Sequence, residues 1–215
     1  MATSQTHSLA APPPQERRKA RASHDEHATT DPAIRTERTE NGQTEGRGLV
    51  VAPPSLLQRV LLTTDGNIGR ILESYAGEAI AAVKLDQLSS PGGEPCHALE
   101  LEADEERLTR SVLLRGSRSG RSLLYADTLV AIERLHPLVR TGLLSTSEPI
   151  GRLLTVARIE TFRDILSAGQ VQAGAVAAHF GIAEDDELFV RTYRIMSGGR
   201  PLMLITEKFP TTSFR

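Results

Sequence analysis

Residues Phe189 to Phe209 read FVRTYRIMSGGRPLMLITEKF, and this stretch contains the strongest fold signal in the chain. Two runs of apolar, β-branched and aromatic residues flank a polar turn with the pair Gly198-Gly199, which is typical of a tight β-hairpin. Side chains alternate between the two faces of a strand, so the second run places Glu207 in an otherwise apolar row. Burying a carboxylate without a partner is costly. We therefore expect an ion pair or a ligand to compensate for it.

A second hairpin is predicted between Arg107 and Val130, where two apolar runs flank the turn-forming residues 115–120. Alternation places Arg110 in a row that otherwise holds leucine and valine. This cation is the natural complement of Glu207, or of an anionic ligand. The pair would then be either a buried ion pair that braces the two hairpins or half of a pocket. In the pocket, the arginine would hold a carboxylate and the glutamate would act on a hydroxyl or a C–H group.

Short helices and further strands are expected around the two hairpins. Apolar periodicity predicts helices over 56–62, 68–75, 132–144 (interrupted at Pro137) and 173–180, and one more that is capped by Ser147 with Pro149 in its first turn. A strand is predicted over 78–88, and residues 158–166 fit a strand or a helix, of which we predict the strand. This succession predicts an α+β fold, with an antiparallel sheet covered by helices on one face.

Composition limits the class of protein. Residues 1–52 have few and irregularly spaced apolar side chains, which predicts a disordered tail before a single domain over 53–215. The net charge of −2 indicates no general attraction to nucleic acid or to anionic membranes, and no apolar run is long enough to span a bilayer. The single cysteine, Cys96, excludes an intramolecular disulfide and a cysteine metal cage and favours a reducing setting. We expect a cytoplasmic monomer whose partner is a small molecule.

Six short motifs within residues 56–209 point to a known family. In chain order they are DGNI (65–68), RSVLL (110–114), EPIGR (148–152), RIETF (158–162), YRIMSGGRP (193–201) and TEKF (206–209). Together they resemble the chorismate lyases, and most of all the actinobacterial branch that makes 4-hydroxybenzoate. The motif YRIMSGGRP, which leads into TEKF in the opening hairpin, is the most specific of the six. The first turn departs from the family pattern, because Asn67, Ile68 and Gly69 stand where a small hydroxyl residue and a Leu-Thr or Met-Thr pair are common.

The resemblance implies a fold, a reaction and a set of site residues. The fold would be an antiparallel sheet backed by helices, with the ligand buried beneath helical flaps. Arg110 would pair with the ring carboxylate of chorismate, and Glu207 would lie against the ring hydroxyl. Ile68 and Ile150 would contribute backbone hydrogen bonds and apolar walls, and Gly151 would let the chain turn close to the ligand. The reaction would remove pyruvate from chorismate and leave 4-hydroxybenzoate, which requires no metal or redox cofactor.

Two other functions stay open. By resemblance, the same fold class also serves as the effector-sensing domain of some bacterial transcription regulators. Those proteins carry a winged helix upstream, which the polar residues 1–52 are not expected to form. The alternative within the enzyme class is a lyase that acts on another enolpyruvyl or hydroxy-cyclohexadiene carboxylate. An assay that follows both pyruvate and the aromatic product distinguishes these functions.

Overall fold

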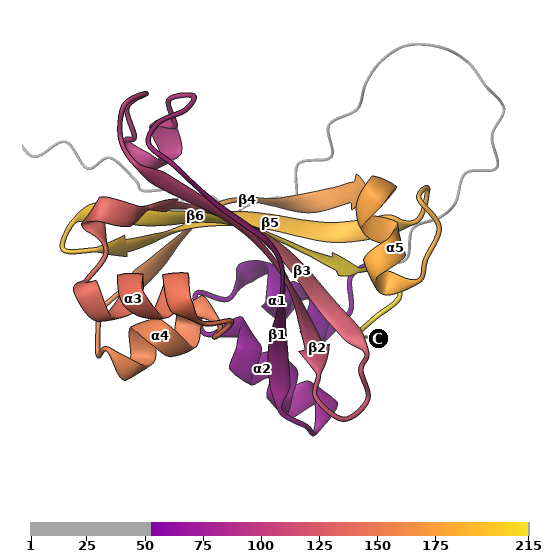
Figure 1. Cartoon of the computed structure of the whole chain (residues 1–215). Coiled ribbons are helices and arrows are strands. Elements are labelled where there is room, and N and C mark those ends of the chain that lie inside the picture. The colour runs from indigo at the N-terminus through magenta and orange to yellow at the C-terminus, as the bar shows by residue number, and fades with distance from the viewer. Residues whose placement is uncertain (1–52, 215) are drawn as a thin grey trace, which may run out of the picture. The chain divides into compact units, whose positions relative to one another are not determined.

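The computed structural model describes residues 53–214, in which six strands form one antiparallel sheet surrounded by short helices (Figure 1). In chain order the elements are α1 (Leu56–Thr63), α2 (Ile68–Ala76), β1 (Ile80–Ser90), η1 (His97–Leu99), β2 (Arg107–Gly116), β3 (Ser122–Ala131), η2 (Ile132–Arg134), α3 (Pro137–Ser145), α4 (Ile150–Val156), β4 (Phe162–Gln172), η3 (Gly174–Val176), α5 (Ala177–Phe180), β5 (Glu187–Ser197) and β6 (Arg200–Pro210). The predicted tail over residues 1–52 lies outside the described residues. None of the described helices is long and apolar enough to cross a membrane.

The sheet joins the two predicted hairpins side by side. Its strand order is β1-β2-β3-β6-β5-β4, with every neighbouring pair antiparallel. The hairpin β2–β3 and the hairpin β5–β6 meet where β3 pairs with β6, at the centre of the sheet. The antiparallel α+β fold is therefore confirmed, and the strands that carry the two predicted charges, β2 and β6, are separated by a single strand.

The hairpin β5–β6 owes its register to its turn and to one irregularity. Gly198 and Gly199 both have positive φ, at 56° and 77°, which is the backbone that a two-residue hairpin turn of type I′ requires. Met196 then pairs with Pro201, but Ile195 pairs with Met203, so Leu202 is an extra residue in β6. Beyond this bulge the pairing is shifted by one residue.

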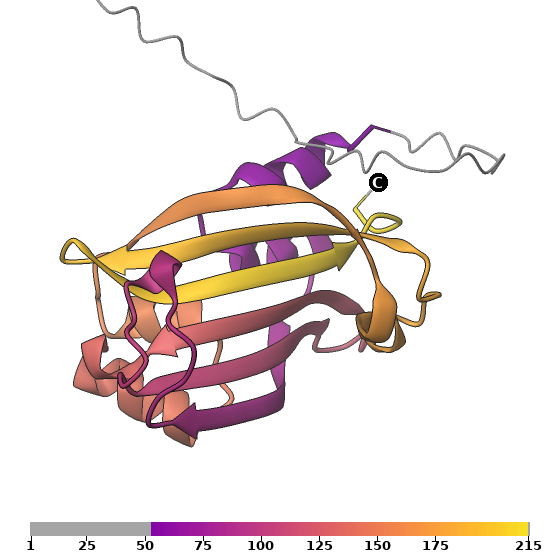
Figure 2. The same cartoon turned by 90° about the horizontal axis from the view of Figure 1, so that it is seen from above.

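Helices α1 to α4 cover one face of the sheet and bury its apolar rows. They lie beneath the sheet in Figure 1 and behind it in Figure 2, which looks onto the sheet from above. The largest apolar cluster unites helix and strand side chains, among them Leu61, Leu72, Val139, Leu154, Leu108, Leu124, Ile195 and Phe209. The predicted covering of one face is thus confirmed. Two short helices are exceptions, since η1 packs near Leu129 and Leu204 on the other face and His179 of α5 stacks on Tyr125.

Three local boundaries differ from the prediction. Pro137 does not interrupt a helix but is the first residue of α3, where its missing N–H costs no intrahelical hydrogen bond. Helix α4 begins at Ile150 after Pro149, so Ser147 is not its cap. Residues 162–166 form a strand as predicted, but β4 begins four residues later than Arg158, whose φ of 53° lies in the left-handed region.

Candidate functional site

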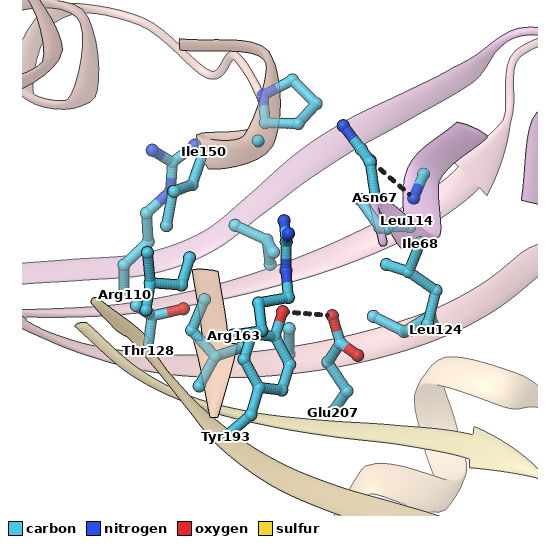
Figure 3. Close-up of a pocket in the computed structure, with 17 residues that line it drawn as sticks. Asn67, Ile68, Arg110, Leu114, Leu124, Thr128, Ile150, Arg163, Tyr193 and Glu207 are labelled. Carbon is cyan, nitrogen blue, oxygen red and sulfur yellow. Dashed lines mark hydrogen bonds between the residues drawn. The ribbon is translucent and has the colours of Figure 1, made fainter. Parts of the chain in front are cut away.

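A cavity of about 90 Å³ lies between the covered face of the sheet and the first residues of α2 and α4 (Figure 3). The five residues predicted from the sequence as site residues all line it: Ile68, Arg110, Ile150, Gly151 and Glu207. Most of the remaining wall is apolar and comes from the inner rows of four strands: Val112, Leu114, Leu124, Ala126, Ile195 and Ile205. The cavity is thus an apolar chamber with a few charged groups, which is the usual composition of a small-molecule site.

Arg110 reaches the cavity from β2 and is almost completely buried, with 2% of its surface exposed. Its Nη2 donates a hydrogen bond to the carbonyl of Glu148 at 3.1 Å, but Nε and Nη1 have no partner among the described protein atoms. Burial lowers the pKa of this guanidinium from its usual value, because desolvation disfavours the charged form. Arg110 is therefore a desolvated cation whose Nε and Nη1 groups are available to donate hydrogen bonds to an anion.

Glu207 does not pair with Arg110, so the first of the two alternatives drawn from the sequence, a buried ion pair that braces the two hairpins, is wrong. Its partner is Arg191 of β5, whose Nε donates to Glu207 Oε2 at 2.7 Å while both side chains are buried. The bulge at Leu202 places these two residues directly opposite one another in the ladder. The ion pair therefore lies within one hairpin, and Arg110 is left without a carboxylate partner among the described residues.

Tyr193 completes the environment of Glu207. Its hydroxyl donates to Glu207 Oε1 at 2.9 Å, and its ring faces Arg191, whose guanidinium carbon lies 4.9 Å from the ring centre. Burial raises the pKa of Tyr193 far above that of a free tyrosine, and the negative charge of Glu207 raises it further. The phenol accordingly stays protonated, and Glu207 is held by hydrogen bonds to both of its oxygens, as Figure 3 shows for Tyr193.

Three arginines attach the turns before α2 and α4 to the sheet. Arg191 donates to the carbonyl of Thr64 at 2.8 Å, and Arg163 of β4 donates to that of Asp65 at 2.9 Å. Arg110 makes the corresponding bond to Glu148. These bonds fix the backbone from which the helices α2 and α4 begin at Ile68 and Ile150.

The starts of α2 and α4 approach each other closely at the mouth of the cavity. Asn67 caps α2, since its side chain accepts a hydrogen bond from the backbone of Gly69 at 3.0 Å. A Cβ atom on Gly151 would lie 3.1 Å from Nδ2 of this asparagine, closer than side chains usually approach. A larger recess adjoins the cavity here and shares Asn67, Gly69, Leu114 and Pro149 with it. Glycine at 151 thus permits the two helix starts to close over the cavity.

Sequence reasoning missed three residues of this site. Arg191 and Tyr193 alternate with apolar residues in the first strand of the opening hairpin, but the extra residue Leu202 is what brings them onto the same face as Glu207, so alternation alone does not find them. Arg163 belongs to a segment whose pattern also fitted a helix, so its face was not predictable. No group of three or more His, Cys, Asp or Glu side chains within residues 53–214 is arranged to hold a metal ion.

Sequence comparison identifies relatives over the same region. A family model described as chorismate pyruvate-lyase Rv2949c-like matches residues 62–215. The chorismate pyruvate-lyase of Mycobacterium leprae (strain TN) is 30% identical over 158 residues, which cover 73% of this chain and 75% of that protein. The protein of the same name from Mycobacterium tuberculosis (strain ATCC 25618 / H37Rv) is 29% identical over 162 residues, or 73% of this chain and 81% of the relative.

Among solved structures, the ligand-binding domain of a protein described as a GntR-family transcriptional regulator, from Bordetella bronchiseptica, superposes with a TM-score of 0.51 at 19% identity, over 62% of this chain and 86% of that domain. PhnF from Mycobacterium smegmatis superposes with a TM-score of 0.55 at 13% identity, over 69% of this chain and 65% of PhnF, which is less than two thirds of that protein. The effector domain of PhnF gives a TM-score of 0.54 at 13% identity, over 67% of this chain and 88% of the domain. At such identities the likeness concerns the fold alone. The family model, in contrast, matches most of the chain, over residues 62–215. The chain therefore belongs to the Rv2949c-like chorismate pyruvate-lyase family.

Proposed function

We propose that this protein is a chorismate pyruvate-lyase that releases pyruvate from chorismate and leaves 4-hydroxybenzoate. The observation that carries the proposal is the pairing of charges in the cavity. Glu207 is a buried carboxylate held by Arg191 and Tyr193, whereas Arg110 is a buried cation with no carboxylate partner in the described chain. A carboxylate ligand would satisfy Arg110 and would lie beside Glu207. Membership of the lyase family supports chorismate as that ligand.

Binding would use the groups that line the chamber. Arg110 would receive the ring carboxylate through Nε and Nη1, which can form two parallel charge-assisted hydrogen bonds. The apolar wall would contact the ring. Ile68 and Ile150 are each the first residue of a helix, so their N–H groups have no acceptor within the helix and could donate to the ligand.

The chemistry is an elimination that makes the ring aromatic. The C4–H bond breaks, its electron pair forms the third ring double bond between C3 and C4, and the C3–O bond breaks with its pair on the departing enolpyruvate. Protonation of the enolpyruvate methylene carbon then gives pyruvate. These changes balance without an oxidant or a reductant. Positioned proton transfer of this kind contributes roughly 10²- to 10⁴-fold to a rate.

Glu207 is the group best placed to assist that transfer. Its carboxylate lines the cavity, and its hydrogen bonds to Arg191 and Tyr193 restrict its orientation. It would contact the ring hydroxyl and the adjacent C4–H group. Fixing the substrate between Arg110 and Glu207 would select one ring orientation, which is the main contribution that a rigid site makes to an intramolecular step.

The direct test follows both products. Purified protein would be incubated with chorismate, with pyruvate measured by a coupled lactate dehydrogenase assay and the aromatic acid by chromatography, against a protein-free blank that rearranges slowly. We expect equal amounts of pyruvate and 4-hydroxybenzoate. Binding of chorismate without release would contradict the proposal and favour an effector-binding domain. Pyruvate with a different aromatic acid would favour a lyase for a related substrate.

Removal of the Tyr193 hydroxyl should slow the reaction without unfolding the protein. Tyr193→Phe keeps the buried ring and deletes one hydrogen bond to a charged acceptor, a loss of about 1.5–3 kcal/mol. Glu207 is then held by Arg191 alone and rotates more freely. We therefore expect kcat to fall about tenfold. Steady-state kinetics and a thermal melt check this. An unchanged kcat would show that the hydroxyl does not position Glu207.

Closure of the helix starts can be tested at Gly151. Gly151→Val would push against Asn67, and we expect kcat/KM to fall about tenfold because the start of α4 is displaced from the cavity. Gly169→Val is the matched control, since a Cβ there meets no atom within 4 Å. Equal kinetics of the two variants would argue against closure at this point.

A further inference from the structure

We propose that Arg163 is a second carboxylate-binding group of the cavity and receives the enolpyruvyl carboxylate of the substrate. The inference rests on the proposed function and extends it, because it states which feature of the ligand distinguishes substrate from product. Chorismate carries two carboxylates, one on the ring and one on the departing enolpyruvyl group. 4-Hydroxybenzoate retains only the first.

Arg163 has the position and the unused charge for this role. It lines the cavity from the edge strand β4, and its guanidinium carbon lies 5.9 Å from the centre of the Tyr193 ring (Figure 3). Its Nη1 donates to the carbonyl of Asp65, so one corner of the guanidinium is anchored while its other N–H groups remain available. No carboxylate in residues 53–214 lies within 4.0 Å of it in an ion pair. The side chain is thus a half-buried, oriented cation.

The charges around the cavity match a dianion. Arg191 and Glu207 neutralise one another at 2.7 Å. Arg110 and Arg163 are the two remaining charged residues of the lining, and neither has a carboxylate partner among the described side chains. A monocarboxylate ligand would compensate for only one of these two cations. A dicarboxylate would compensate for both.

The strands place the two cations apart. Arg110 belongs to β2 and Arg163 to β4, and the strands β3, β6 and β5 lie between them. Glu207 and Tyr193 belong to two of these intervening strands, so the reacting part of a bound chorismate would lie between its two anchored carboxylates. Charge that develops on the departing enolpyruvate would also be stabilised by Arg163, since a preorganised cation stabilises such charge in a desolvated site.

The test compares ligands that differ by one carboxylate. The probes are 4-hydroxybenzoate and 3-(carboxymethoxy)-4-hydroxybenzoate, a stable aromatic acid with a second carboxylate on an ether, titrated by calorimetry into the wild type and Arg163→Gln. We expect the wild type to prefer the dicarboxylate by about 30-fold, and Arg163→Gln to lose this preference while its affinity for 4-hydroxybenzoate changes less than about threefold. With chorismate, kcat/KM should fall by about the same 30-fold.

Controls separate binding from support of the turn at Asp65. Arg163→Lys should restore part of the preference because the charge is kept, and Arg115→Gln removes an exposed arginine outside the cavity and should change nothing. An equal loss of affinity for both probes in Arg163→Gln would overturn the inference, because it would indicate a structural role through Asp65. Since the titration needs no turnover, a wild type that binds the dicarboxylate preferentially but releases no pyruvate would refute the proposed function and leave this inference supported.

Discussion

Arg110→Met is expected to abolish detectable turnover and to leave the folded protein as stable as the wild type, or more stable. The guanidinium is buried among apolar side chains and makes one hydrogen bond, to Glu148, while two of its nitrogens have no described partner. Replacing a buried, poorly compensated charge with an apolar side chain of similar length is often neutral or stabilising. Loss of a bidentate contact to a carboxylate should weaken ligand binding by about 10²- to 10³-fold, or about 3–4 kcal/mol.

Opposite changes in stability and binding would be the signature of a residue kept for its ligand. The measurements are thermal unfolding of the ligand-free protein, titration with 4-hydroxybenzoate and pyruvate release from chorismate. Arg110→Lys is the matched variant, since it keeps the charge but loses the planar fork, and we expect it to bind more weakly than the wild type and more tightly than Arg110→Met. A strongly destabilised Arg110→Met with unchanged kinetics would show that Arg110 serves the fold instead.

Period-two alternation alone identified the two charged residues Arg110 and Glu207, and the family resemblance added Ile68, Ile150 and Gly151. Alternation placed Glu207 and Arg110 on the inward rows of two hairpins, and both line one cavity. The signal is robust because one face of each strand is buried, so a slip of one residue would expose its whole apolar row. The turn at Gly198 and Gly199 was equally predictable, since few other residues tolerate two successive positive φ angles.

The partner of Glu207 could not be predicted, because it depends on the register between β5 and β6. Without the extra residue Leu202, Glu207 would lie opposite Val190 instead of Arg191. A bulge of this kind has no residue signature in the segment, so the choice between Arg110 and Arg191 required the pairing itself. The late start of β4 could not be predicted either. Arg158 adopts a left-handed backbone conformation that is typical of glycine, and its sequence gives no sign of it.

The second large effect is expected at the buried ion pair, where Glu207→Gln should reduce both rate and stability. Glutamine keeps the shape and part of the hydrogen bonding but leaves the charge of Arg191 uncompensated, and breaking a buried pair in this way costs about 3–5 kcal/mol. We therefore expect Tm to fall by roughly 6–20 °C for a domain of this size. Loss of the carboxylate should lower kcat by roughly 10²- to 10⁴-fold, while 4-hydroxybenzoate still binds through Arg110.

The double variant Arg191→Met/Glu207→Gln separates catalysis from support of the hairpin. Removing both charges relieves the uncompensated cation, so the double variant should recover most of the stability that Glu207→Gln loses. If Glu207 acts on the substrate, kcat must stay low in the double variant, because no carboxylate faces the ring. Recovery of kcat along with Tm would mean that the pair only holds β5 and β6 together. Arg191 is fully buried and is not part of the cavity wall, so its removal takes away no direct contact with the ligand. It also removes the hydrogen bond to the Thr64 carbonyl, so titration with 4-hydroxybenzoate shows whether the start of α2 has moved.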